Sequence, residues 1–267
     1  MTDQTAIDIA FDVMQNAPDP AQAQPQYLAR ISDSLLYILL TKEIDDGQME
    51  PELFDVDGTA IVLAFDTSER LVEFTQTPSP YVEMSGRALV QMLEGEGLGL
   101  GINLGAASEN LLAPEAVDWM AVTLDERPQD VEERIEEITA PKNMPENLLL
   151  SLGAKLAMAG RLADCAYMMS ATYASGRVGT LMAFIGAEDW AREPLAQAVQ
   201  EVLSFSGYET GEVDVSFFLA DDPVVANFEA HGLKLEMPEP QPQEIDIQEL
   251  GGPKAPGMDP DAPPKLR

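Results

Sequence analysis

The sequence predicts an α+β protein, with two small domains of mixed or antiparallel sheets and packed helices, followed by a disordered proline-rich tail. Three observations predict this class. Segments with the helical spacing of apolar residues alternate with short apolar runs typical of strands. A charged connector over residues 126–140 separates two such series. Eight prolines crowd residues 238–267, a density that neither a helix interior nor a central strand tolerates.

The first half of the chain begins with a predicted helix over residues 6–16. Apolar residues stand at positions 7, 10, 11 and 14, which is the spacing of one helix face. The pair Pro18 and Pro20 then breaks the chain. The further elements expected here are a helix over 21–33, buried strands over 34–41 and 58–65, a helix over 85–94 that ends before Gly95, a strand over 97–103, and a helix from Pro114 to 124.

The connector is compatible with a helix or a strand, and the spacing of Val131, Ile135 and Ile138 favours a helix. Beyond it, Ser175-Gly176-Arg177 has the chemistry of a hairpin turn between two strands. The expected elements of the second half are a helix over 145–160, strands over 163–174 and 178–186, a helix over 190–206, a strand over 213–219, a short helix opened by Asp222 and Pro223, and a strand over 233–237.

These elements divide the chain into a domain over residues 1–125, the connector over 126–140, a domain over 141–237 and the tail over 238–267. Within the tail, only residues 244–250 combine enough apolar side chains to order on a partner.

The charge balance excludes several classes of protein. The 267 residues carry 15 Lys and Arg against 47 Asp and Glu, a formal charge of −32. This argues against nucleic acid and anionic membrane as partners, because both require clustered basic residues. No apolar run approaches the length of a membrane span, and the N-terminus lacks the basic region of a signal peptide. We therefore expect a soluble cytoplasmic protein.

The chemistry-bearing residues are few. A single Cys165 and a single His231 exclude a disulfide framework and any His/Cys zinc site. We expect Cys165 to be a small buried thiol in a strand and His231 to mark a helix end. The glycines over 95–101 fail the dinucleotide pattern G-x-G-x-x-G, so we expect no cofactor and interpret them as a helix cap and a closely packed strand.

Asp55 and Asp57 are the candidate metal ligands. They stand in an acidic stretch before a predicted strand, but an EF-hand loop would need acids where the chain has Leu53 and Ala64. An oxygen site of another kind stays open. The other interpretation is a solvated acidic loop with a turn at Gly58.

Methionines gather around the second predicted sheet. Core filling is their ordinary role, and the alternative is an adaptable apolar surface for a partner protein. The residues that would form that surface are Met158, Met168, Met169 and Met182.

Six segments carry a resemblance to a known family: 35–40, 59–68, 85–89 and 101–105 in the first half, and 140–146 and 164–169 in the second. Their order resembles that of the SseB family, the enhanced serine sensitivity proteins, which have an N-terminal and a C-terminal SseB domain. The resemblance extends over about residues 25 to 237. It implies a bacterial cytoplasmic protein and assigns no catalytic motif.

Taken together, the sequence predicts a non-catalytic protein-interaction or regulatory module rather than an enzyme. Its partner is expected to be a protein, and a basic one would suit the acidic charge. A carboxylate-based metal-binding or small-molecule-binding protein is the alternative, and an acidic protein related to secretion or chaperoning is the second alternative.

Overall fold

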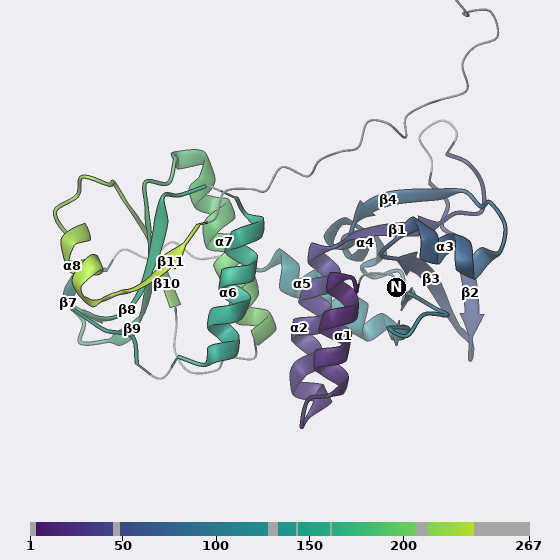
Figure 1. The fold of residues 1–267 in the computed structure, drawn as a ribbon, viewed down its shortest axis with the longest axis horizontal. Helices are drawn as coiled ribbons and strands as arrows, with labels where there is room; N and C mark the ends of the chain where they lie inside the picture. The colour runs from purple at the N-terminus through teal and green to yellow at the C-terminus, as the bar shows by residue number, and fades with distance from the viewer. Residues whose placement is uncertain are drawn as a thin grey trace, which may run out of the picture.

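The computed structural model describes residues 4–44, 49–127, 133–142, 144–160, 162–206 and 213–237, and the tail predicted over 238–267 lies outside these residues. The described residues form two α+β units that meet through helices (Figure 1). Each unit contains one mixed sheet, so the predicted fold class is confirmed.

The first unit is built on a six-stranded sheet in the order β4-β1-β3-β5-β6, with β2 also paired to β3. Only β3 and β5 run parallel, and the other pairs are antiparallel. The strands are β1 (Leu35–Leu39), β2 (Leu53–Val56), β3 (Thr59–Phe65), β4 (Tyr81–Ser85), β5 (Gly99–Ile102) and β6 (Asn110–Leu112).

The helices cover the two faces of this sheet unequally. Four of them bury their apolar stripes against one face and share a single core: α1 (Ala6–Gln15), α2 (Pro20–Asp33), α4 (Gly86–Leu93) and α5 (Pro114–Asp125). The short α3 (Ser68–Thr75) packs Leu71 on the opposite face, over β1 and β3. The part of that face toward β4 therefore lacks a helix among the described elements.

The second unit has a five-stranded sheet in the order β10-β9-β8-β11, with β7 paired to another part of β8. Two long helices, α6 (Glu146–Met158) and α7 (Asp189–Ser206), cover one face, and α8 (Val225–His231) packs on the other. The strands are β7 (Ile135–Thr139), β8 (Cys165–Tyr173), β9 (Val178–Ile185), β10 (Val213–Phe218) and β11 (Leu233–Glu236).

The helix favoured for the connector is wrong where the structure describes it. Residues Ile135–Thr139 form β7, which pairs with β8. A bulge between Ile135 and Glu137 shifts the register, so Ile135 and Ile138 pack into the same core despite their three-residue spacing. A bulged strand can thus imitate the spacing of a helix face. Val131 lies outside the described residues.

The other corrections are smaller. α8 begins at Val225, and Asp222 and Pro223 lie in the preceding turn, where Asp222 Oδ1 accepts a hydrogen bond from the Val224 amide at 3.0 Å. The elements β2, α3, β4 and β6, each of at most eight residues, were not predicted.

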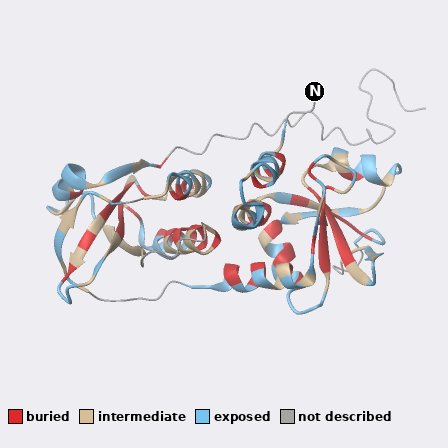
Figure 2. Cartoon of the chain, turned by 90° about the horizontal axis from the view of Figure 1, so that it is seen from below, coloured by how far each residue is buried: buried red, intermediate tan, exposed pale blue. Residues whose placement is uncertain are grey.

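Figure 2 shows the helices of the two units facing one another across their junction. α2 and α5 of the first unit contact α7 of the second. Phe205 of α7 joins the core of the first unit and lies edge-on to Trp119, with ring centroids 5.4 Å apart. None of the helices in the described ranges is long and apolar enough to cross a membrane.

Candidate functional site

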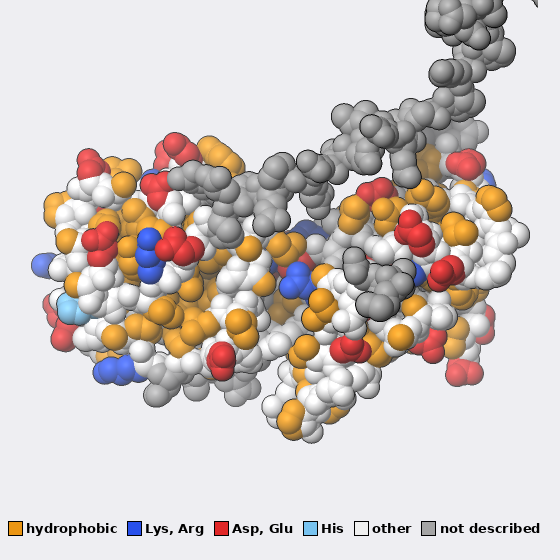
Figure 3. Space-filling view, in the orientation of Figure 1, with side chains coloured by type: hydrophobic (Ala, Val, Ile, Leu, Met, Phe, Trp, Pro, Cys, Tyr) orange, Lys and Arg blue, Asp and Glu red, His pale blue; other side chains and the backbone are white. Residues whose placement is uncertain are grey.

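Four charged side chains meet at the junction of the two units. Glu201 of α7 accepts from Arg87 Nη2 at 2.6 Å and from Lys155 Nζ at 2.9 Å, and Lys155 also pairs with Asp33. Arg87 and Asp33 belong to the first unit, and Lys155 and Glu201 to the second. We call these residues the junction cluster. It links both units through opposite charges, and Figure 3 shows basic side chains at this boundary.

Glu201 is the most buried member of the junction cluster. Its side chain is 3% exposed, and Gln197 Nε2 donates to its second oxygen at 3.2 Å. Burial acts to raise the pKa of Glu201, but Arg87 and Lys155 outweigh it and hold that pKa below its usual value. The carboxylate therefore stays charged at neutral pH. A cavity lies beside it, lined in part by Ser32 and Phe205.

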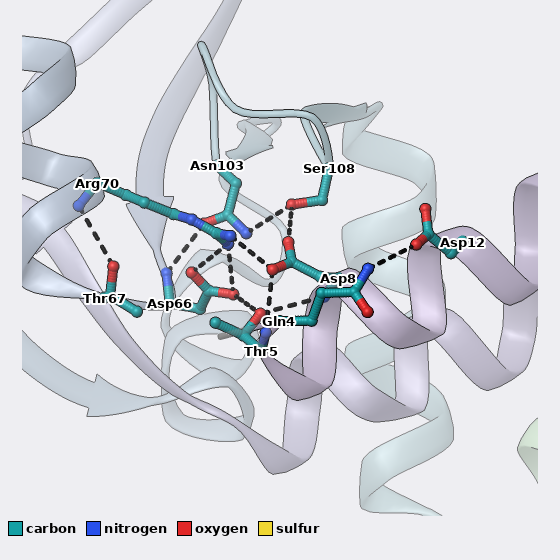
Figure 4. A network of polar contacts seen from close by, with 9 residues as sticks. All are labelled: Gln4, Thr5, Asp8, Asp12, Asp66, Thr67, Arg70, Asn103 and Ser108. Carbon is teal, nitrogen blue, oxygen red and sulfur yellow. Dashed lines mark hydrogen bonds and ion pairs between the residues drawn. The ribbon is translucent and has the colours of Figure 1, made fainter. Parts of the chain in front are cut away.

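A second network lies where β3 and β5 end (Figure 4). Arg70 of α3 donates to both oxygens of Asp66, at 2.8 and 2.9 Å, and to Asp8 Oδ2 at 2.6 Å. Thr5 caps α1, and its hydroxyl donates to Asp66 Oδ2 at 2.5 Å. One guanidinium thus ties the first turn of α1 to the end of β3.

Asn103 completes this network from the end of β5. It is fully buried and has a left-handed backbone, with φ of 52°, which lets its side chain turn back toward β3. Its Oδ1 accepts from the Asp66 amide at 3.0 Å, and its Nδ2 donates to Ser108 Oγ at 3.2 Å. Ser108 in turn donates to Asp8 Oδ1 at 2.5 Å. The polar side chains of the network satisfy one another.

A third cluster lies in the second unit around Arg177, at the turn between β8 and β9. Arg177 Nη2 lies 2.7 Å from Glu133 Oε2 and 3.0 Å from Asp214 Oδ2. The guanidinium also stacks over Tyr173, 4.2 Å from the ring centroid, and the Tyr173 hydroxyl donates to Asp214. The cluster fastens Glu133, two residues before β7, and the edge strand β10 to this hairpin.

Among the described residues for which a pKa shift is resolved, every pKa moves away from neutrality. Burial acts to raise the pKa of Asp8, but hydrogen bonds from Arg70 and Ser108 lower it to about 2. Burial raises the pKa of Tyr27 to about 12 and also raises that of Cys165. General acids and bases work best with a pKa near the operating pH, so these groups are poorly suited to proton transfer.

Comparison with known families bears on the first unit. Residues 11–119 match the model of the SseB protein N-terminal domain. The first unit thus contains an SseB N-terminal domain. The matched residues extend from α1 to α5, so they contain the Asp66–Arg70 pair, Asn103 and Arg87 of the junction cluster. That the second unit resembles an SseB C-terminal domain stays a prediction. A search of curated proteins and a search of solved structures gave no match.

The two candidate metal ligands lie in a tight hairpin of the SseB N-terminal domain. Asp57 and Gly58 are the two residues between β2 and β3, and both have positive φ, as a type I′ turn requires. Asp55 Oδ1 accepts from the Gly58 amide at 3.2 Å. Within the described ranges, no group of three or more His, Cys, Asp or Glu side chains could hold a metal ion. The geometry accounts for Asp57 as a turn residue and for Asp55 as a β2 residue whose side chain bonds the turn.

The glycines over 95–101 adopt the predicted structural roles in this SseB domain. Gly95 follows α4 with φ of 73°, as a helix cap does. A Cβ on Gly99 would lie 2.8 Å from both Ile61 Cγ2 and the Leu112 carbonyl oxygen, and one on Gly101 would lie 2.8 Å from Leu63. Close packing of β5 therefore requires glycine at 99 and 101.

The single imidazole and the single thiol lie in the second unit. His231 is the last residue of α8, as expected, and is exposed. Cys165 is the first residue of β8 and is partly buried rather than fully buried.

Three of the four methionines proposed as a contact surface are core residues. Met168, Met169 and Met182 have no exposed surface, because they point into the two cores on either face of the second sheet. The contact-surface interpretation is therefore wrong for these three, and core filling is confirmed. Met158 is 52% exposed at the end of α6, where Arg30 Nη1 of the first unit lies 3.6 Å from its sulfur.

The three charged networks were not predicted from the sequence. Asp8, Asp66 and Asn103 are far apart in the chain, and nothing in their local pattern indicates that they meet. One signal was present: Asp66 directly follows one predicted strand, and Asn103 is the last residue of another. Because β3 and β5 are parallel, those strand ends lie side by side.

Proposed function

We propose that this protein is non-catalytic and acts by binding another protein, as an interaction or regulatory module. The observation that carries the proposal is how the fold uses its buried charges. Asp8 and Asp66 are paired with Arg70, and Glu201 is paired with Arg87 and Lys155. These ion pairs hold elements and units together. Each charge is paired with an opposite charge of the protein rather than directed at a substrate.

The displaced pKa values support the same proposal. Proton transfer favours a carboxylate raised toward neutrality or a lysine lowered toward it. Where a shift is resolved in these networks, the pKa of a carboxylate is lowered, as in Asp8, and the pKa of a basic group is raised, as in Arg70. Such shifts stabilise the charged forms and are typical of structural ion pairs.

The charge balance indicates the chemistry of the partner. A formal charge of −32 attracts a basic protein and repels nucleic acid and anionic membrane. We also propose that the protein is located in the cytoplasm. A chain with one cysteine cannot form an internal disulfide, so it does not need an oxidising compartment.

The test begins with chemical cross-linking of the full chain in native lysate, identification of the cross-linked proteins, and purification of each candidate partner. Titration calorimetry with the purified full chain then measures binding directly. The proposal predicts saturable binding that weakens as salt rises from low to moderate concentration. Absence of binding to every purified candidate, together with turnover of a metabolite by the purified chain, would contradict it.

A further inference from the structure

The sheet of the first unit has an open edge at β4. β4 is the last strand in the order β4-β1-β3-β5-β6, and no described strand pairs with its outer side. Figure 1 shows β4 at the margin of the sheet. A strand in this position offers a row of backbone donors and acceptors to an incoming extended segment.

The register determines which backbone groups of β4 face outward. The Leu40 amide donates to Pro80 and the Gly86 amide donates to Ser34, so the hydrogen-bonded pairs of β1 and β4 fall at even-numbered residues. Antiparallel residues direct both of their backbone groups to the same side, and neighbours alternate. The N–H and C=O groups of Tyr81, Glu83 and Ser85 therefore face away from β1.

The sheet surface beside this edge carries large apolar side chains, and α3 covers only part of it. Leu35 is 50% exposed and Tyr81 is 45% exposed, whereas Tyr37 between them is half-buried. The rings of Tyr37 and Tyr81 meet edge-on, with centroids 5.6 Å apart. Because Tyr37 pairs with Glu83 across the strands, the Glu83 side chain lies on this same face.

Carboxylates border the aromatic pair. Glu83 on β4 and Glu69 on α3 are both exposed, and both lie close enough to Tyr37 to raise its pKa in addition to the effect of burial. Tyrosine rings attract Lys and Arg side chains through their faces, and carboxylates attract them through charge. The surface thus suits basic side chains.

Glu83 also distinguishes between possible occupants of the edge. It is the central residue of β4 (Tyr81–Ser85), so antiparallel pairing of two copies about the strand centre places two Glu83 side chains opposite each other. Like charges directly opposite are unfavourable, whereas a Lys or Arg in the same position is favoured. The strand therefore disfavours a second copy of this chain and accepts a cationic strand.

We propose that the outer edge of β4, with Tyr37, Tyr81 and Glu83 beside it, is the docking site for an extended basic segment of a partner protein. The inference rests on the proposed function and specifies its surface. The segment adds a strand to β4, and its alternate side chains, which are basic, lie over the two tyrosines and beside Glu83.

The test uses a fluorescein-labelled short peptide of alternating lysine and valine, with an alternating glutamate and valine peptide as its control. Anisotropy titrations compare the full chain with Glu83→Lys and with Glu229→Lys, an equal charge change on exposed α8 of the other unit. We expect the cationic peptide alone to bind, with Glu83→Lys weakening binding by about five- to tenfold and Glu229→Lys by less than about twofold. Thermal unfolding by circular dichroism checks that both variants fold.

Amide chemical shifts on the full chain locate the peptide. Shifts of the Tyr81, Glu83 and Ser85 amides on binding support the proposal. Equal weakening by Glu83→Lys and Glu229→Lys, or shifts confined to other strands, would overturn it, as would dimers of the chain alone that protect these amides. If a purified partner binds the wild type and Glu83→Lys equally, the docking site is wrong while the proposed function stands.

Discussion

Replacing Glu201 by Gln tests whether the junction cluster holds the two units together. The change keeps the size of the side chain and removes its charge. Arg87 then loses its carboxylate partner, whereas Lys155 keeps Asp33. Because the Glu201 side chain is 3% exposed, water compensates little for the loss at that position.

Two bounds set the size of the effect. Breaking a fully buried ion pair by removing one partner costs about 3–5 kcal/mol, and one hydrogen bond to a charged group contributes about 1.5–3 kcal/mol. Arg87 is 33% exposed and can turn partly to water, and Lys155 stays paired. We therefore expect Glu201→Gln to lower the free energy of unfolding by about 2–3 kcal/mol, near the lower bound.

Urea unfolding followed by tryptophan fluorescence measures this loss. The chain has two tryptophans, and Trp119 packs against Phe205 across the junction, whereas Trp190 is 70% exposed. In a Trp190→Phe background the signal therefore comes from Trp119, which lies at the junction. The Glu201→Gln variant should shift the midpoint to lower urea, and Glu229→Gln, an exposed control on α8, should leave it unchanged.

A double-mutant cycle separates the ion pair from other effects of the substitution. Arg87→Met and Glu201→Gln should be less damaging together than the sum of the two single changes, with a coupling of about 1–2 kcal/mol. Additive effects, or an unchanged midpoint in the single Glu201→Gln variant, would refute the reasoning that these charges join the units.

Three further predictions concern the first unit and α6. The pKa of Asp8 in the folded protein is about 2, below its ordinary 3.8, so its stabilisation is complete above about pH 4 and is lost as the pH falls toward 2. Asp8→Asn should lower the free energy of unfolding by about 2 kcal/mol at pH 7 and flatten the pH dependence of urea unfolding between pH 4 and 2. A pH dependence as steep as that of the wild type would count against the network. Gly86→Ala should strongly destabilise the protein in thermal melts, because its Cβ would lie 1.9 Å from the Ile31 carbonyl oxygen. Gly153→Ala in α6 has open space around it and should stabilise the protein by about 0.5–1 kcal/mol. The opposite order of stabilities would show this account of the packing to be wrong. Asp57→Asn should leave thermal stability unchanged or slightly higher, since Asn suits a type I′ turn, and calorimetry with Ca²⁺ should show no saturable binding to the wild type that the variant lacks.

The spacing of apolar residues was enough to predict the longer helices and strands. The helices α1, α2, α6 and α7 and the β8–β9 hairpin lie close to their predicted ranges, because each buries a continuous apolar stripe or run. Shorter elements carry too few residues for a period to show. α3 buries only Leu71, and its main signal is the cap in which Thr67 accepts from the Arg70 amide.

The sites were less predictable than the fold, for a physical reason. Asp8, Arg70 and Ser108 meet only after β3 and β5 have paired, and Arg87 meets Glu201 only after the two units have docked. Contacts of this kind depend on tertiary structure and leave no local pattern. The methionines were misleading in the same way, since Met168, Met169 and Met182 lie in a strand pair whose faces are both covered.

Hydrogen exchange on the full chain, with and without the purified partner, tests most directly whether the protein works by contact. The account predicts slower exchange at the amides of Tyr81, Glu83 and Ser85 when the partner is present, with exchange at the Asp8–Asn103 network unchanged. Exchange unaltered throughout the described residues at a saturating partner concentration would contradict it.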